Sequence, residues 1–340
     1  MGRFLYPIAK PIPRLKNRKI ERRINLANKK ITVSKTTRRL VIQENVAAYL
    51  FLLPFLLFFV GFVLYPMFMC VRTSFFDSTM GREDIFIGFQ NYYEMMFKEG
   101  VAADGSTTYG DPVFWVALKN TMIIVLVSVP VVTAFSLWIA TIISRMKVAA
   151  TSAFRCIFYL PVVTGSVAVT MVWKWMFNNY YGIFNYIGKE VGLLEKNINW
   201  LGDPKYALGC IILILLTTSV GQPIVLYVSA LDNVDKSLVE AAEVDGANKT
   251  QAFWRIKWPQ MMPTTLYILV ITTINSFQCF ALIQLLTSGG PKNSTMTIMY
   301  YIYYSAFKLY KYGYGNAMGV ILAIIIAILS AIQFKAGQEK

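Results

Sequence analysis

The chain contains no histidine and only four cysteines among its 340 residues. Histidine is the commonest general base, and without it neither a Ser-His nor a Cys-His pair can form. The cysteines are widely spaced in or beside apolar segments, with no CxxC pair: Cys70, Cys156, Cys210 and Cys279. We interpret them as packing thiols. The sequence therefore predicts no catalytic residue and no metal site, and we do not expect an enzyme.

Two further absences narrow the class of protein. The chain has no GxxxxGK[ST] loop, which an ATPase would need to cradle phosphate. Asp and Glu total 18 against 33 Lys and Arg, and no acid lies deep within a long apolar stretch. Ion-coupled secondary carriers need such intramembrane acids, so that class is disfavoured, although it stays open as an alternative. A membrane enzyme or sensor without transport activity is a third alternative, and only the hydrophobicity of the chain supports it.

Apolar residues are what the sequence has in excess, with 56% hydrophobic residues and a mean hydropathy of +0.50. They gather into stretches of about 20 residues, enough for a helix to cross a hydrocarbon core. Six spans can be drawn, at residues 47–67, 113–143, 157–177, 206–231, 263–286 and 314–334. We therefore expect an all-α polytopic membrane protein with six transmembrane helices.

Basic residues predict the orientation of these spans. The formal net charge of +15 would suggest a nucleic-acid partner in a soluble protein, but 13 of the Lys and Arg residues precede the first span. If both termini are cytoplasmic, 22 Lys and Arg lie inside and 9 lie in the outer loops at 68–112, 178–205 and 287–313. This asymmetry agrees with the positive-inside rule. We expect cytoplasmic N- and C-termini, no nucleic acid, and contact of the basic arm with membrane lipid.

Aromatic side chains cluster where the spans meet the loops. Examples are Trp173, Trp175, Tyr180, Tyr181, Tyr300 and Tyr301. Because amphipathic rings settle at the level of the lipid headgroups, we interpret these residues as interfacial belts. A platform on which sugar rings stack is the alternative.

The second inner loop, at 232–262, is too rich in small and charged residues to be only a connector. Helix formers run from Leu238 to Val244, and Gly246 allows the backbone to turn before a second helix. Alanines in this loop would let another backbone come close, and its carboxylates could pair with basic groups. The pattern predicts a helix-turn-helix that serves as a docking surface.

The spacing within this loop resembles the EAA loop of ABC importer permeases. The pattern is Glu240-Ala241-Ala242, three residues, Gly246, nine residues, Ile256, one residue, and Trp258-Pro259, with Trp258 where a leucine is usual. The resemblance implies a coupling helix seated in a cleft of a cytoplasmic ATPase. The implied coupling residues are Glu240, Ala241, Ala242, Asp245, Gly246, Ala247, Ile256 and Pro259.

The resemblance extends over residues 115–334 and is specific to sugar permeases of the maltose and glycerol-phosphate type. It includes Asn120-Thr121, Phe154-Arg155, Tyr159-Leu160-Pro161, Trp173-Lys174-Trp175-Met176-Phe177 and Ser276-Phe277-Gln278. Two positions depart from the family pattern: Ala281 stands where an aspartate is common, and Ser288 replaces a glycine. The resemblance implies a type I ABC importer permease fold. Its expected parts are a basic cytoplasmic arm at 1–45, the first transmembrane helix with an external loop at 46–112, and the permease domain at 113–336.

The same resemblance implies a function and a set of partners. The chain would be the permease subunit of an ATP-driven importer in a bacterial plasma membrane, translocating a sugar, and specifically an oligosaccharide. An extracellular solute-binding protein would deliver the sugar, and a second permease subunit and two cytoplasmic ABC ATPase subunits would complete the complex. The ATPases would use ATP and Mg²⁺, so no cofactor is expected in this chain. A non-sugar solute, such as a glycerol-phosphate or a peptide, is the alternative.

Polar residues inside the spans are candidates for the substrate path, because such groups are costly in lipid unless they find partners or face water. The candidates are Asn120, Gln222, Asn275, Gln278 and Gln284. For each of them an interhelical hydrogen bond is the alternative. Asn275 and Gln278 are three residues apart and share a helical face with Thr272, which we expect to line the cavity. The sequence Gly221-Gln222-Pro223 predicts a local break of the fourth span, with freed carbonyls pointing into the same cavity.

Overall fold

The computed structural model describes residues 35–101 and 107–338 and divides into two compact units, Met1–Pro66 and Met67–Lys340. In the first unit, α2 (Lys35–Phe59), the π-helical turn η1 (Val60–Leu64) and the start of α3 (Tyr65–Thr73) follow one another without a break. Every side chain between residues 48 and 66 is exposed. A helix of this length and hydropathy is suited to crossing a membrane. Residues 1–34 of the predicted basic arm lie outside the described residues.

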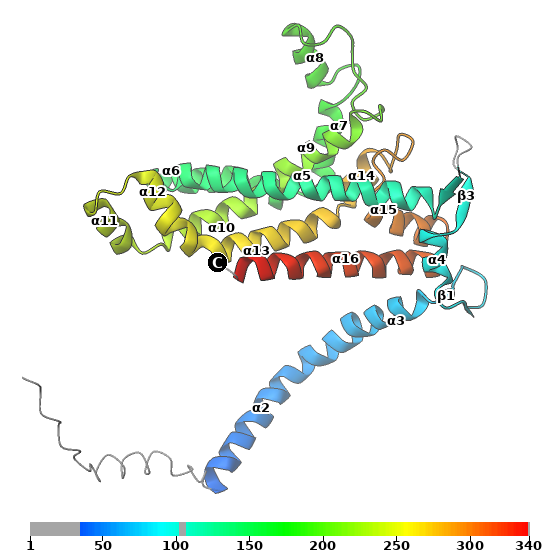
Figure 1. Cartoon of the computed structure of the whole chain (residues 1–340), viewed down its shortest axis with the longest axis horizontal. Helices are drawn as coiled ribbons and strands as arrows, with labels where there is room; N and C mark the ends of the chain where they lie inside the picture. Colours follow the sequence, from blue (N-terminus) through cyan, green and yellow to red (C-terminus); the bar gives the residue numbers. More distant parts are fainter. Residues whose placement is uncertain (1–34, 102–106, 339–340) are drawn as a thin grey trace, which may run out of the picture. The chain divides into compact units, whose positions relative to one another are not determined.

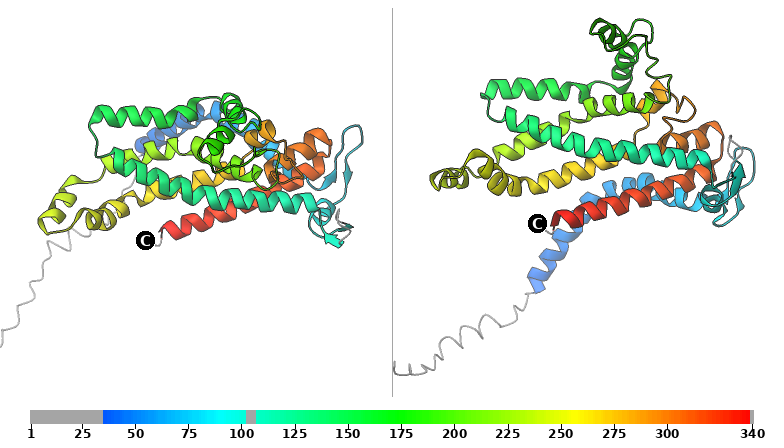
Figure 2. Two further views of the ribbon diagram at one scale, coloured as in Figure 1. Left: turned by 90° about the horizontal axis from the view of Figure 1, so that it is seen from above. Right: turned by 45° about the horizontal axis from the view of Figure 1, so that its top comes forward.

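The second unit is a bundle whose long helices run side by side (Figures 1 and 2). These helices are α5 (Pro112–Ile143), α10 (Gly221–Asp232), α13 (Trp258–Phe277) and α16 (Tyr312–Gln338). Helix α5 packs against both α10 and α13, and α13 also packs against α16. Two apolar clusters fill the bundle: one includes Phe114, Phe277 and Met318, and the other includes Ile224 and Tyr227.

The start of α5 is set by a single carboxylate. Asp111 Oδ1 accepts hydrogen bonds from the backbone N–H groups of Val113 (2.8 Å) and Phe114 (3.4 Å), and Pro112 occupies the first helical position. Asp111 Oδ2 accepts from the hydroxyl groups of Tyr301 and Tyr314, the latter at 2.7 Å. One side chain therefore caps α5 and ties it to two later elements of the chain.

Five helical stretches are long and apolar enough to cross a membrane, and a bent pair of helices brings the number to six. The five stretches are Ala48–Thr73, Pro112–Ile143, Ala207–Asp232, Lys249–Leu286 and Tyr312–Gly337. They cover the predicted first, second, fourth, fifth and sixth spans, which are confirmed. Within the fifth, α13 gives way to α14 (Ala281–Leu286) after a short break.

The third predicted span, at 157–177, falls on two bent helices that are long and apolar enough to cross a membrane only when taken together. These helices, α6 (Val148–Val163) and α7 (Ser166–Met176), meet at an angle of 94°. Thr164 and Gly165 between them have extended backbones, with ψ angles of 130° and 137°. Threonine and glycine are weak helix formers, and Pro161 just before them lacks a backbone donor, so the helix ends here at little cost.

The predicted break in the fourth span is confirmed. A single residue, Val220, separates the end of helix α9 (Ala207–Ser219) from the start of α10. Pro223 cannot donate the backbone hydrogen bond that would continue α9. The Val220 carbonyl accepts the helical hydrogen bond of the Ile224 N–H (3.0 Å) and a second one from Ser136 Oγ on α5 (3.3 Å). Pro223 leaves the Ser219 carbonyl without its helical donor, and Ser219 lines the first cavity described below. That freed carbonyls point into the cavity stays a prediction.

The loops predicted to lie outside contain short elements that the sequence did not predict. These are β1 (Phe76–Asp77), β2 (Ile85–Phe86), α4 (Gln90–Met96), β3 (Glu99–Val101), β4 (Thr107–Tyr109), α8 (Ile183–Glu190), α15 (Ile298–Tyr303) and η3 (Tyr304–Lys308). Strand β1 pairs antiparallel with β2, and β3 with β4. Backbone hydrogen bonds from Met80 to Tyr310 and from Gly313 to Ser78, both 3.2 Å, join the first of these loops to the third. These two loops therefore lie at the same end of the bundle.

Burial corrects two of the sequence interpretations. Tyr300 and Tyr301 are only 4% and 8% exposed, so they belong to the packed core and not to an interfacial belt. Cys210 and Cys279 are buried, as expected of packing thiols, whereas Cys156 is exposed. In both cases the residue type alone did not say which face of its helix would be covered.

Candidate functional site

The predicted docking loop is a helix-turn-helix at one end of the bundle, opposite β3 and α4 (Figure 1). Helix α11 (Lys236–Val244) is followed by a turn, α12 (Lys249–Ala252) and the π-helical turn η2 (Phe253–Lys257), which leads into α13. Asp235 caps α11 by accepting hydrogen bonds from the Ser237 hydroxyl (2.7 Å) and amide (2.9 Å). Both bonds hold the pKa of this exposed carboxyl below its ordinary value.

Gly246 ends α11 in a Schellman motif. Its φ angle is +83°, in the left-handed region that glycine tolerates best. The Ala247 N–H donates to the Ala242 carbonyl (2.9 Å), and the Gly246 N–H donates to the Glu243 carbonyl (3.1 Å). Asn248 then starts α12 with a reciprocal capping box that it forms with Gln251. The turn between the two helices is therefore built from local hydrogen bonds.

Helix α11 has no buried residue. Glu240, Ala241 and Asp245 are exposed, and Val244 is 88% exposed on the same short helix. Among the other predicted coupling residues, Ala242, Ala247 and Ile256 are half-buried, while Gly246 and Pro259 are exposed. Val239 packs against the core of the bundle, and most of the other side chains of α11 are exposed. That exposed face is available to a partner, as the predicted docking role requires.

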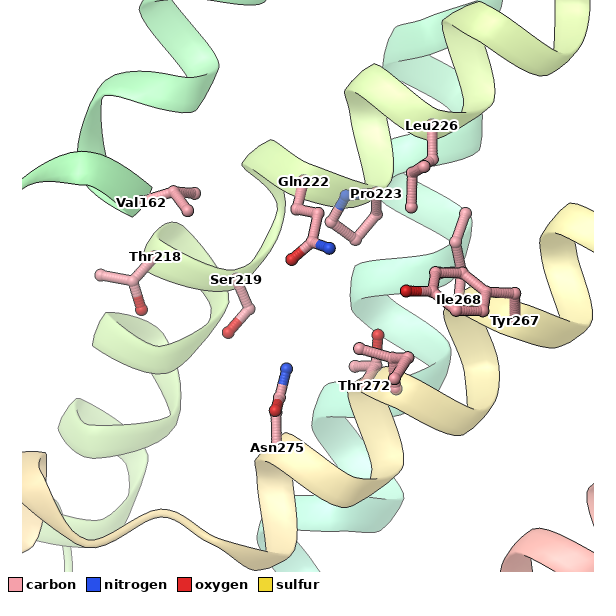
Figure 3. Close-up of a pocket in the computed structure, with 11 residues that line it drawn as sticks. Val162, Thr218, Ser219, Gln222, Pro223, Leu226, Tyr267, Ile268, Thr272 and Asn275 are labelled. Carbon is pink, nitrogen blue, oxygen red and sulfur yellow. The ribbon is translucent and has the colours of Figure 1, made fainter. Parts of the chain in front are cut away.

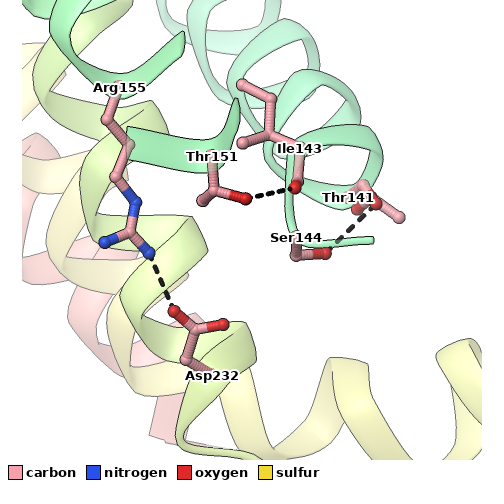
Figure 4. Close-up of polar contacts among 6 residues, drawn as sticks. All are labelled: Thr141, Ile143, Ser144, Thr151, Arg155 and Asp232. Carbon is pink, nitrogen blue, oxygen red and sulfur yellow. Dashed lines mark hydrogen bonds and ion pairs between the residues drawn. The ribbon is translucent and has the colours of Figure 1, made fainter. Parts of the chain in front are cut away.

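Two contacts fasten this segment to the bundle. The Asp235 backbone N–H donates to Gln260 Oε1 on α13 (3.3 Å). Arg155 on α6 forms an ion pair with Asp232 at the end of α10 (2.8 Å), as Figure 4 shows. These contacts link the start of the coupling segment to three membrane helices, α6, α10 and α13.

A cavity of about 160 Å³ lies between α9, α10 and α13, with Val162 of α6 also in its lining. Figure 3 shows Gln222 and Asn275 on its opposite walls, with Ser219, Thr218 and Thr272 between them. The structure therefore brings Gln222 and Asn275 together, and it places Thr272 on the same face as Asn275, as predicted.

A second cavity, of about 510 Å³, shares Val162, Thr218 and Asn275 with the first. Gln278 lines this second cavity together with Pro161 and Thr164 at the α6–α7 bend. In both cavities, hydroxyl and amide groups lie among apolar side chains such as Val162 and Leu215. Hydroxyl and amide groups can exchange hydrogen bonds with the hydroxyl groups of a solute.

Two of the predicted path residues lie elsewhere. Asn120 is 6% exposed, and its Nδ2 donates to the backbone carbonyls of Asn293 (3.2 Å) and Met296 (3.0 Å). It therefore fastens α5 to the loop before α15, a packing role like that of the predicted alternative, although the partner is a loop and not a helix. Gln284 is half-buried on α14 and lines neither cavity.

Sequence reasoning missed several groups that the structure places at these sites. Thr218 and Ser219 line the cavity just before the break in the fourth span, and the run of hydroxyl residues there was a signal that could have identified them. Arg155 and Asp232 are 77 residues apart, so no local pattern pairs them. Within the described residues, no three His, Cys, Asp or Glu side chains are grouped to hold a metal ion.

The chain is similar to known transport proteins along most of its length. The family described as binding-protein-dependent transport system inner membrane component matches residues 45–335. The probable ABC transporter permease YesP of Bacillus subtilis is 33% identical, over 87% of this chain and 92% of the relative. The lactose transport system permease LacF of Rhizobium radiobacter is 30% identical, over 87% and 95%. The multiple sugar-binding transport system permease MsmF of Streptococcus mutans is 31% identical, over 85% and 94%.

A solved structure shares the fold. One chain of a bacterial ABC transporter involved in importing the acidic polysaccharide alginate superposes with a TM-score of 0.73 at 22% identity, covering 88% of this chain and 97% of the other. The chain thus has an ABC permease fold. Because the family match covers most of its length, this chain belongs to the family of binding-protein-dependent transport system inner membrane components.

Proposed function

We propose that this permease subunit forms half of the membrane path of an importer for a sugar, and specifically for an oligosaccharide. Two of the relatives are named for lactose and for multiple sugars, and the alginate transporter shares the fold. The two cavities, to whose lining Gln222, Asn275 and Gln278 contribute, suit a neutral, hydroxyl-rich solute, since no charged side chain lines either cavity. A solute-binding protein delivers the sugar to the outer loops.

Helix α11 carries the proposal, because it is folded and capped yet has no fully buried residue and leaves Glu240, Ala241 and Val244 exposed. It offers Glu240, Ala241 and Asp245 to a cytoplasmic ATPase, and its attachments to α6, α10 and α13 transmit the motion to the cavity walls. Two such ATPase subunits hydrolyse ATP with Mg²⁺, and a second permease subunit completes the path. This chain itself holds no cofactor in the proposal.

The proposed orientation places both termini and α11 in the cytoplasm of a bacterial cell. The charge asymmetry supports it. Contacts in the structure agree with the proposed assignment of loops to the two sides of the membrane. The first and third predicted outer loops are hydrogen-bonded to each other, and Arg155 pairs with Asp232 at the opposite end of the bundle. The charge rule then decides which end is inside.

Replacing Glu240 with Ala, or Gly246 with Ala, tests the coupling role. Each variant should insert into the membrane at wild-type levels and show weaker co-purification of the ATPase or slower uptake. Glu195→Ala, in a predicted outer loop, is the matched control and should transport normally. Wild-type uptake by both the Glu240 and the Gly246 variant would show that α11 is not the ATPase-coupling helix.

Uptake of a panel of labelled solutes in a deletion strain tests the substrate class. The panel contains oligosaccharides, a phosphoglycerol compound and short peptides, and we expect only oligosaccharides to accumulate. If only the phosphoglycerol compound or only the peptides accumulated, the substrate would belong to that class of compound and the proposal of a sugar substrate would be wrong. Uptake that survives ATP depletion but collapses with an ionophore would point to an ion-coupled carrier instead.

A further inference from the structure

A pocket of about 490 Å³ lies outside the sites described so far, between the predicted inner end of α5 and the α12–η2 segment. Helix α5 contributes Trp138, Thr141 and Arg145 to its lining, and Lys249 and Trp254 line it from the other segment. It therefore joins a transmembrane helix to the stretch of chain that leads from the coupling helix α11 into α13.

The charges in this pocket all have one sign. Arg145 and Lys249 are exposed, and no carboxylate lines the pocket. Neither residue takes part in the ion pairs formed within the described residues. Two cations without carboxylate partners, on one pocket, favour an anionic occupant. Leu137 and Phe253, which also line the pocket, favour an occupant with an apolar part.

Two indole rings flank the cations. Trp138 is 60% exposed and Trp254 is 56% exposed. Exposed tryptophans at the end of a membrane span settle at the level of the lipid headgroups, where the apolar core meets water. A basic pocket at this depth, bordered by apolar side chains, has the chemistry of a lipid headgroup site.

We propose that this pocket binds an anionic phospholipid, with the phosphate between Arg145 and Lys249 and an acyl chain along Leu137. Which leaflet supplies the lipid depends on the orientation given in the proposed function, but the binding of the lipid does not depend on it. A bound lipid would touch Lys249 and Trp254, and so would restrain the segment that joins the coupling helix to α13. Transport would then depend on the anionic lipid content of the inner leaflet.

Native mass spectrometry of the delipidated full-length chain, titrated with phosphatidylglycerol, tests the binding. Replacing Arg145 and Lys249 together with Gln should weaken the affinity for phosphatidylglycerol roughly tenfold or more. Binding of phosphatidylcholine should not change. Exchanging the two residues (Arg145→Lys with Lys249→Arg) keeps the charge and should keep the affinity.

The matched control is Lys147→Gln with Lys335→Gln, which removes two exposed cations at the same predicted membrane face but outside the pocket. Equal loss of affinity in the control and the pocket variant would overturn the proposal, because general attraction would then suffice. So would displacement of the lipid by inorganic phosphate alone. Loss of co-purifying permease or ATPase subunits with unchanged lipid affinity would mark the pocket as a protein interface. Because the lipid titration does not measure transport, it still tests lipid binding if the proposed importer function is wrong.

Discussion

At the scale of single residues, the polar side chains of the spans separate into two kinds. Asn120 is buried and gives both hydrogens of its amide to backbone carbonyls. Asn275 and Gln222 are exposed to a cavity and face each other across it (Figure 3). The same amide group therefore stabilises packing at one position and is free to meet a solute at the other.

We predict that Asn120→Ala destabilises the protein, whereas Asn275→Ala impairs uptake without destabilising it. The first change strands two buried carbonyls, at a cost of about 1–3 kcal/mol. The second removes a side chain that no packing contact needs, with an effect within about 0.5 kcal/mol. The melting temperature in detergent and the uptake rate are the two measurements. Equal melting temperatures for the two variants would contradict the distinction.

The turn after α11 gives a second prediction at this scale. No atom lies within 4 Å of where a Cβ of residue 246 would be, so only the φ angle of +83° opposes a side chain. Gly246→Ala should therefore cost about 1–2 kcal/mol locally, and Gly246→Asn less, since asparagine tolerates this conformation. We expect uptake to fall in the order Gly, Asn, Ala. If uptake by the Asn variant were as slow as uptake by the Ala variant, the glycine would be needed for something other than its positive φ angle.

At the scale of elements, the breaks in the helices place the cavity. The α6–α7 bend brings Pro161 and Thr164 to the second cavity, and the interruption at Val220 brings Ser219 and Gln222 to the first. Unbroken helices would have carried these side chains along regular stripes. The path thus depends on positions where the helix-forming tendency is weak.

Packing between α6 and α10 gives a prediction for one of these elements. A Cβ at Gly221 would lie 2.3 Å from the Phe158 carbonyl oxygen on α6, a backbone atom that cannot move alone. Gly221→Ala should therefore separate the two helices and cost about 1–3 kcal/mol. Gly209→Ala, in α9, is the matched control, because nothing lies within 4 Å of its Cβ. Thermal unfolding in detergent measures both, and similar melting temperatures would refute the contact.

At the scale of the whole molecule, the charge pattern predicts which loops face the cytoplasm. Tyr180 in a predicted outer loop is 85% exposed, and Val148 in a predicted inner loop is 84% exposed. In a variant whose four cysteines are replaced by serine, we expect Tyr180→Cys to react with an impermeant maleimide in intact cells. Val148→Cys should react only after permeabilisation. The reverse pattern would invert the proposed topology.

The sequence by itself determined the membrane spans, the helix-turn-helix of the coupling segment and the break in the fourth span. These features depend on local causes: stretches of apolar residues long enough for lipid, capping residues a few positions away, and a proline that cannot donate. The predicted orientation and the roles of the coupling residues follow from the same local patterns and stay predictions.

Only the tertiary structure decided which polar residues meet in a cavity. Asn120 bonds to a carbonyl 173 residues away, and Arg155 pairs with Asp232 across 77 residues. The short hairpins, the burial of Tyr301 against Asp111 and the angle of the third span also depend on elements that are distant in the chain. A residue's type states which partners it needs, but the packing of helices determines whether it finds them, and that packing is what separates the path residues from the structural ones.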